Sequence, residues 1–277
     1  MLPIGRHEGL LRVHLTNSVR DEYHSLMVAR NPFDARHVES RRGGPVKKPL
    51  SRDAIVTEAL RQLTSNGIEG MSIRKVATAL DTGPASLYAY VEDLNELHAL
   101  VLDRALAKVN LRDAANASWR ERLQGVLKSY GRVLIASPGL AQLALSTIAV
   151  GPNALRITDK LLALLEEGGV ELATGAWAVD LLMLYVTAIV TERSNGVDPA
   201  APEGAVARAV AAVSERDYPR VYAARVQLLS GTGEERFAWA LEVFLRGILR
   251  TPRPPQVEPT AVATKKPRTR KRPPRVR

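Results

Sequence analysis

The sequence contains no cysteine, and this absence excludes several kinds of site at once. Without a thiol the chain cannot form a disulfide, a thiolate metal site or a cysteine nucleophile, and it fits a reducing compartment. Histidine is also scarce, since four of the five histidines precede residue 38. The sequence has no HExxH motif, no P-loop and no GxGxxG motif after a strand. We therefore expect no catalytic residues, no metal site, no cofactor and no enzymatic activity.

Long apolar runs are absent as well. The longest dense apolar stretch, Trp177 to Val190, has 14 residues and includes Asp180, whereas a helix needs about 20 apolar residues to span a bilayer. This stretch therefore predicts a buried helix. The amino terminus carries scattered arginines but no sustained apolar run followed by a small-residue cleavage site, so it does not resemble a signal peptide. These features predict a cytoplasmic protein without a membrane partner.

The formal net charge of +10 is concentrated near the two ends of the sequence. Residues 265–277, KKPRTRKRPPRVR, contain eight basic residues and no acidic one, and residues 1–49 also carry a basic excess. The part between them is nearly neutral. A basic chain favours a polyanionic partner such as nucleic acid, but a solvated and disordered charge run explains the ends equally well.

Apolar residues recur at helical spacing between the two ends, without an alternating strand pattern, which predicts an all-α fold. Residues 1–49 lack this periodicity and end in a Gly- and Pro-rich linker, so we expect a poorly ordered extension there, or a translation start near Met27 instead. Residues 50–95 carry short helices, and residues 96–250 carry longer ones. The composition of residues 251–277 predicts a disordered tail rich in Pro, Lys and Arg.

Two of the short helices form a helix-turn-helix pattern. Ser72 is placed to cap the first, residues 81–83 break it, and Pro84 opens the second at the first-turn position where proline is tolerated. Such a pair lets one helix lie in the major groove of DNA while the other braces it. We expect small and hydroxyl-bearing side chains on its outer face to approach DNA, namely Thr82, Ala85, Ser86, Tyr88 and Tyr90. A plain helical hairpin with a surface pair of tyrosines explains the same pattern.

The segment Ser51 to Leu97, and above all SIRKVATALDTGPASLYAYVEDLNEL, resembles the DNA-binding domain of the TetR family of repressors. The shared pattern is a capping Ser or Thr, an alanine in the second helix, a turn, a short third helix with Leu-Tyr, and a charged start to the fourth. One departure is Leu94, where family members usually have a lysine. The resemblance implies a helix-turn-helix DNA-binding domain over residues 50–95. It also implies contacts with DNA phosphates from Lys47, Lys48 and Arg52. The other residues that it places at operator DNA are Ser72, Thr82, Pro84, Ala85, Ser86, Tyr88 and Tyr90.

The last apolar helix predicted before the tail is EERFAWALEVFLRGILR, residues 234–250. Its apolar stripe is of the kind that usually packs in a core. In TetR-family proteins a similar final helix joins an earlier apolar helix in a four-helix dimer interface, and residues 172–193 are the natural partner here. The resemblance therefore implies a homodimer whose two DNA-binding domains reach half-sites about 34 Å apart. The expected interface residues are Leu181, Leu184, Phe237, Leu241, Phe244, Leu245 and Ile248.

The resemblance further implies that residues 96–250 hold a small-molecule site whose occupancy changes the spacing of the two DNA-binding domains. Candidate lining residues on the apolar central helix are Trp177, Met183, Tyr185 and Thr187, which combine aromatic surface with a few polar groups. His98 lies where the fourth helix can couple this site to the DNA-binding domain. Ordinary core or interface positions explain all five residues as well, and no residue identifies the chemistry of the effector.

These observations predict a sequence-specific transcriptional regulator: a dimeric repressor that binds a palindromic double-stranded operator and is released by a small-molecule effector. The alternative is an architectural DNA-binding protein of low specificity that relies on its basic ends. That alternative predicts weak sequence preference with a steep salt dependence, whereas a regulator predicts specific binding at least about 10³-fold tighter than nonspecific binding.

Overall fold

The computed structural model describes residues 33, 50–137, 139–194 and 204–254, and every regular element in these ranges is helical. The predicted all-α fold is therefore confirmed. The predictions of a poorly ordered extension, with Lys47 and Lys48, and of a disordered basic tail from residue 255 onward lie outside the described residues.

The first group of helices is short and its boundaries follow local chemistry. Ser51 and Ser72 cap two helices by accepting hydrogen bonds from the backbone N–H groups of Ala54, at 3.1 Å, and Lys75, at 3.2 Å. Pro84 occupies the first position of the next helix, as predicted. The elements are α2 (Arg52–Asn66), η1 (Ile68–Gly70), α3 (Ile73–Ala79), α4 (Pro84–Leu87) and α5 (Leu94–Leu106).

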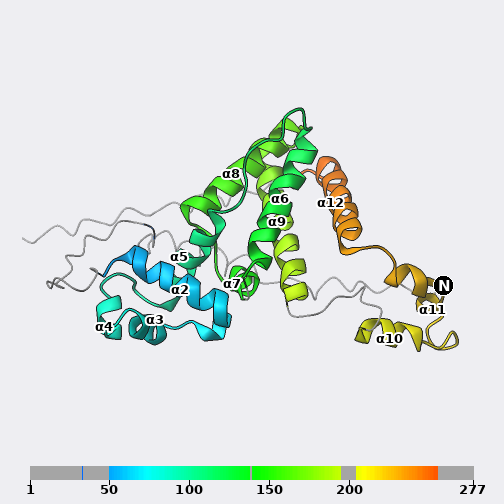
Figure 1. Cartoon of the computed structure of the whole chain (residues 1–277). Coiled ribbons are helices and arrows are strands. Elements are labelled where there is room, and N and C mark those ends of the chain that lie inside the picture. Colours follow the sequence, from blue (N-terminus) through cyan, green and yellow to red (C-terminus); the bar gives the residue numbers. More distant parts are fainter. Residues whose placement is uncertain (1–32, 34–49, 138, 195–203, 255–277) are drawn as a thin grey trace, which may run out of the picture.

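The second group is a bundle in which the longest helix, α9, packs against α6, α7 and α8. Helix α12 packs on α9, whereas α10 and α11 pack on each other and lie away from the bundle in Figure 1. These elements are α6 (Trp119–Ile135), α7 (Leu140–Ser146), α8 (Pro152–Glu167), α9 (Leu172–Ser194), α10 (Ala205–Ala211), α11 (Pro219–Leu229) and α12 (Gly233–Arg250).

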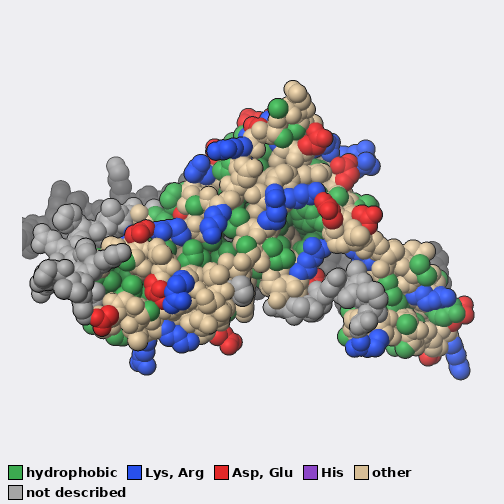
Figure 2. Space-filling model, viewed as in Figure 1, with side chains coloured by type: hydrophobic (Ala, Val, Ile, Leu, Met, Phe, Trp, Pro, Cys, Tyr) green, Lys and Arg blue, Asp and Glu red, His purple; other side chains and the backbone are tan. Residues whose placement is uncertain are grey.

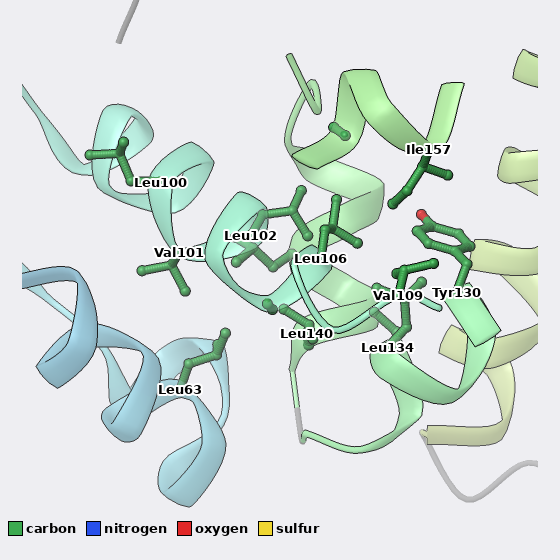
Figure 3. Packing of buried hydrophobic residues seen from close by; sticks show 14 of the residues in the cluster. Leu63, Leu100, Val101, Leu102, Leu106, Val109, Tyr130, Leu134, Leu140 and Ile157 are labelled. Atoms are coloured by element: carbon green, nitrogen blue, oxygen red, sulfur yellow. The ribbon is translucent and has the colours of Figure 1, made fainter. Parts of the chain in front are cut away.

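Helix α5 joins the two groups through one continuous apolar core. Its residue Val101 lies toward α2 and Leu63, whereas Leu102 and Leu106 lie toward Leu140 of α7 and the bundle (Figure 3). All five side chains are buried. Residues 50–93, which we call the head, are therefore attached to the bundle by a packed helix and not by a loose linker.

Helix α9 is apolar on nearly all sides. It has 23 residues, and its most apolar window has a mean hydropathy of 1.7, so by length and composition alone it could cross a membrane. A core helix of a folded bundle passes the same test, and α9 packs against α6, α7, α8 and α12. The predicted helix over residues 172–193 is thus present with nearly the predicted bounds, but one of its faces is exposed.

Candidate nucleic-acid interface

Helix α4 is held by one buried side chain and exposes the others. Leu87 is fully buried among the apolar residues of the head, which fixes the orientation of this four-residue helix. Pro84, Ala85 and Ser86 are exposed, and Tyr88, directly after the helix, is 52% exposed. Thr82 is partly buried in the preceding turn. The structure thus brings these five predicted residues together on one protruding edge of the head, where a groove of DNA can receive them.

Tyr90 does not face outward, and the prediction that it does is wrong. The residue is only 7% exposed and belongs to the apolar core with its neighbour Val91. Helical spacing would place it above Ser86, but α4 ends at Leu87 and the chain then turns. The N–H of Tyr90 donates to the carbonyl oxygen of Leu87 at 2.8 Å, a tight turn that directs the ring back toward α5.

Arg52, which was predicted as a phosphate contact, has a partner within the fold. Its guanidinium is partly buried and pairs with the carboxylate of Glu96 in α5. Glu96 also accepts a hydrogen bond from the backbone N–H of Glu92. Arg52 therefore ties the start of α2 to the start of α5. Ser72 is likewise used in part by the fold, because its hydroxyl oxygen caps α3.

Two basic residues of the head were not among the predicted contacts. Arg74 and Lys75 are exposed in the first turn of α3, the helix that precedes the turn into α4. The sequence signal was their place just after the capping Ser72, where exposed cations lie close to the expected path of a DNA backbone. Leu94, the departure from the family pattern, is exposed at the first position of α5.

The head is joined to the bundle by polar contacts as well as by the core. Asp103 of α5 is buried, and its Oδ1 accepts from the backbone N–H groups of Asn153, at 2.9 Å, and Ala154, at 3.0 Å. Its Oδ2 accepts from the side-chain amide of Asn153 at 2.8 Å. One carboxylate of the connecting helix therefore caps the N-terminus of α8, an arrangement that the helix dipole favours.

A second junction lies at the corner between α6 and α7. Gly139 has φ +79°, and a Cβ built there would lie 2.6 Å from the backbone nitrogen of Ile68 in the head. Only glycine permits this backbone conformation together with such a close approach. The hydroxyls of Thr64 and Ser137 lie 3.3 Å apart at the same corner. At this junction the two backbones therefore lie in direct contact.

The five predicted ligand residues do not line one common cavity. Thr187 is buried and hydrogen-bonds the hydroxyl of Tyr130 at 2.8 Å, and burial raises the pKa of this tyrosine. Tyr185 makes an edge-to-face contact with a phenylalanine of α12, Phe244, at 4.8 Å between ring centroids. Trp177 is exposed on α9, Met183 is partly buried, and His98 lies half-buried on α5. These residues thus occupy core and surface positions in the fold, and their role in ligand binding stays a prediction.

The outer face of α9 carries an exposed apolar stripe of Trp177, Leu181 and Leu184, and α12 continues it with Trp239 and Val243. Among the predicted interface residues, Leu181 and Leu184 belong to this outer face. The structure contradicts the prediction for Leu241 and Leu245, which are fully buried within the chain. The other three predicted interface residues on α12 are partly buried against the core of the chain, namely Phe237, Phe244 and Ile248. Trp239 and Val243 were missed because they lie outside the regular stripe.

Comparison with known proteins agrees with this arrangement. Residues 113–251 match the family model described as tetracyclin repressor-like, C-terminal domain. A curated HTH-type transcriptional regulator from Saccharopolyspora erythraea is 31% identical over 175 residues, which cover 62% of this chain and 74% of that protein.

Two solved structures from Streptomyces coelicolor extend the likeness to the head. A transcription regulator is 39% identical with a TM-score of 0.65, over 76% of this chain and 100% of that one. Apo ActR is 30% identical with a TM-score of 0.67, over 74% of this chain and 97% of that one. ActR has also been crystallised in complex with (S)-DNPA and with actinorhodin. The chain described here belongs to the TetR family of transcriptional regulators.

Proposed function

We propose that this regulator is a homodimeric repressor that binds a palindromic double-stranded operator and dissociates from it when a small molecule binds. The observation that carries the DNA-binding part is the edge formed by α4, where small and hydroxyl-bearing side chains surround the exposed Tyr88 above the buried Leu87. Small side chains let the backbone approach the base edges, and hydroxyls donate to phosphates or bases. Arg74 and Lys75 add exposed positive charge beside this edge.

The dimer is supported by the outer face of α9 and α12. Exposed apolar residues of a monomeric protein are usually scattered, whereas here Trp177, Leu181, Leu184, Trp239 and Val243 lie on two helices that pack together. A two-fold dimer buries the same patch on both subunits. It also places two copies of α4 at a fixed spacing, as a palindromic site requires.

The ligand response is supported by relatives, since ActR is 30% identical and forms complexes with (S)-DNPA and actinorhodin. In this protein the helices that would respond are coupled to the head in two ways: by α5, through the Asp103 cap of α8, and by the contact of the Gly139 corner with Ile68. An effector that binds better to the DNA-incompetent arrangement shifts the population toward it. As a member of the TetR family, the protein would act in the cytoplasm.

The test is selection of bound duplexes from a random DNA pool by the full-length protein, at two salt concentrations, with the stoichiometry of the complex measured. A specific regulator enriches one inverted repeat bound by two chains. A variant lacking residues 265–277 should keep the enriched sequence but show a shallower salt slope, because fewer phosphates are neutralised. If no sequence is enriched and binding disappears with the tail, the low-specificity architectural function replaces the one proposed.

A further inference from the structure

A cleft of about 470 Å³ opens between α6, the C-terminal half of α9 and the N-terminal turn of α12. Its apolar lining consists of Leu127, Ile135, Val186, Ile189, Val190 and Phe237. In Figure 2 a hollow with apolar side chains at its base lies between α6 and α12, with basic side chains along its edge. None of the five ligand residues predicted from the sequence lines this cleft.

Ion pairs connect α6 and α12 beside the cleft. Lys128 of α6 pairs with Glu234 of α12 at 3.1 Å, and Arg120 pairs with Glu242 at 3.5 Å. Beneath these bridges α6 approaches α9 closely at Gly131, where a Cβ would come within 3.2 Å of a methyl group of Val186. Of these two ion pairs, Lys128–Glu234 lines the cleft, together with the apolar floor.

The cleft is lined by more basic than acidic residues. Lys128, Arg132 and Arg193 line the cleft, and the single acidic lining residue, Glu234, is paired with Lys128. Within the described parts of the chain, neither Arg132 nor Arg193 forms an ion pair. The Arg193 guanidinium lies against the first turn of α12, since a Cβ on Gly233 would meet its Nη2 at 1.9 Å. A cation is unfavourable at the positive end of a helix dipole, and a bound anion would relieve this repulsion.

We propose that this cleft binds an amphipathic organic anion, with an apolar or aromatic body on the floor and a carboxylate or sulfonate between Arg132 and Arg193. Its volume lies in the range of small-molecule sites, which combine a mostly apolar lining with a few placed polar groups. The anion would form charge-assisted hydrogen bonds to guanidinium groups that lack an acidic partner. This inference rests on the proposed function and gives the effector a chemical class.

The position of the cleft is compatible with the proposed dimer. On α9, Val186, Val190 and Arg193 lie on the side opposite to Leu181 and Leu184, because residues five, nine and twelve positions after Leu181 fall about half a turn away from it. The cleft therefore stays accessible when the outer face is covered. An occupant nevertheless touches α12, the helix that carries Trp239 and Val243 of the proposed interface.

The test uses the full-length protein without DNA and two fluorescent probes. One is 1-anilinonaphthalene-8-sulfonate, an aromatic anion, and the other is N-phenyl-1-naphthylamine, which has the same rings without the sulfonate. The double variant Arg132→Gln/Arg193→Gln should weaken binding of the anionic probe at least about threefold, because two exposed charge contacts are lost. Its affinity for the neutral probe should stay unchanged. Arg156→Gln, on the exposed side of α8, is the matched control and should change neither.

A variant that fills the cleft tests whether the probes bind there. Ile135 is 50% exposed at the edge of the cleft, so Ile135→Trp can fill the space without burying a new residue in the core, and it should reduce the binding of both probes. If Ile135→Trp leaves the anionic probe bound as in the unmodified protein, or if the double variant binds it equally well, the proposal is wrong. Operator binding measured without any probe remains a separate test, so failure of the site and failure of the proposed function can be told apart.

Discussion

Asp103 links α5, the helix that carries the head, to α8 of the bundle, and removing its carboxylate should be costly. Asp103→Ala leaves three donors without their acceptor: the backbone N–H groups of Asn153 and Ala154 and the side-chain amide of Asn153. Asn153 is partly exposed and can be rehydrated, whereas Ala154 is buried. Hydrogen bonds contribute about 1 kcal/mol each, and the lost charge at the N-terminus of α8 adds about 0.5 kcal/mol. We expect a loss of about 3 kcal/mol in the free energy of unfolding.

The assay is urea unfolding at one fixed protein concentration, because the stability of a dimer depends on concentration. Asp159→Ala, which removes an exposed carboxylate from α8, is the matched control and should change the free energy by less than about 0.5 kcal/mol. A loss below 1 kcal/mol for Asp103→Ala would show that the carboxylate does not hold the junction.

Gly151 provides a second test of the same contact. A Cβ there would lie 2.2 Å from Oδ1 of Asp103 and 2.6 Å from the ring of Phe33, so Gly151→Ala forces both side chains to move. Such overpacking costs about 1–3 kcal/mol. In the Asp103→Ala background the larger collision is absent, so Gly151→Ala should cost less than it does alone. Equal costs in the two backgrounds would mean that the two residues are not coupled.

Three further predictions concern DNA contact, assembly and pH. Tyr88→Ala should weaken operator binding by about tenfold or more while leaving stability nearly unchanged. Tyr90→Ala should destabilise the fold by about 3 kcal/mol because the ring is buried. The opposite pattern in binding and unfolding assays would contradict the placement of these two tyrosines. Leu184→Glu should convert the dimer to monomers in analytical ultracentrifugation, whereas the same change at Leu155, exposed on α8, should not; a persisting Leu184→Glu dimer would place the interface elsewhere. Burial lowers the pKa of His98 below 6.5, although the charge of Asp93 acts in the opposite direction. The histidine therefore binds a proton more readily in the unfolded chain than in the folded one. The free energy of unfolding should fall as the pH drops below about 6.5. His98→Gln should remove that part of the pH dependence, and unchanged unfolding curves between pH 7 and 5 would refute it.

Features encoded by neighbouring residues could be predicted from the sequence. The Ser72 cap, the turn before Pro84 and the burial of Leu87 follow from local hydrogen bonding, proline geometry and helical spacing, and all three are present in the structure. Tyr90 shows where this reasoning ends, because helical spacing applies only as far as the helix continues. Helix α4 ends at Leu87, and the turn that follows buries the tyrosine.

Features that depend on distant residues could not be predicted in the same way. The stripe containing Leu241 and Leu245 correctly indicates a buried face, but periodicity does not say whether the same chain or a partner buries it. Asp103 resembles a surface acid in the sequence, and its partners lie about 50 residues further along the chain. The cleft beside α12 depends on how three helices meet, so Arg132 and Arg193 have no local signal that marks them as a pair.

The backbone contact at Gly139 makes regulation vulnerable to a single missense mutation far from both sites. Any other residue there must displace the start of η1 at Ile68, and we expect this displacement to tilt the head relative to the bundle. Such an allele would retain every DNA-facing side chain and every residue of the cleft, yet it would present the recognition helix at a changed angle. In a genetic screen it would behave as a defect of signalling in an otherwise intact regulator.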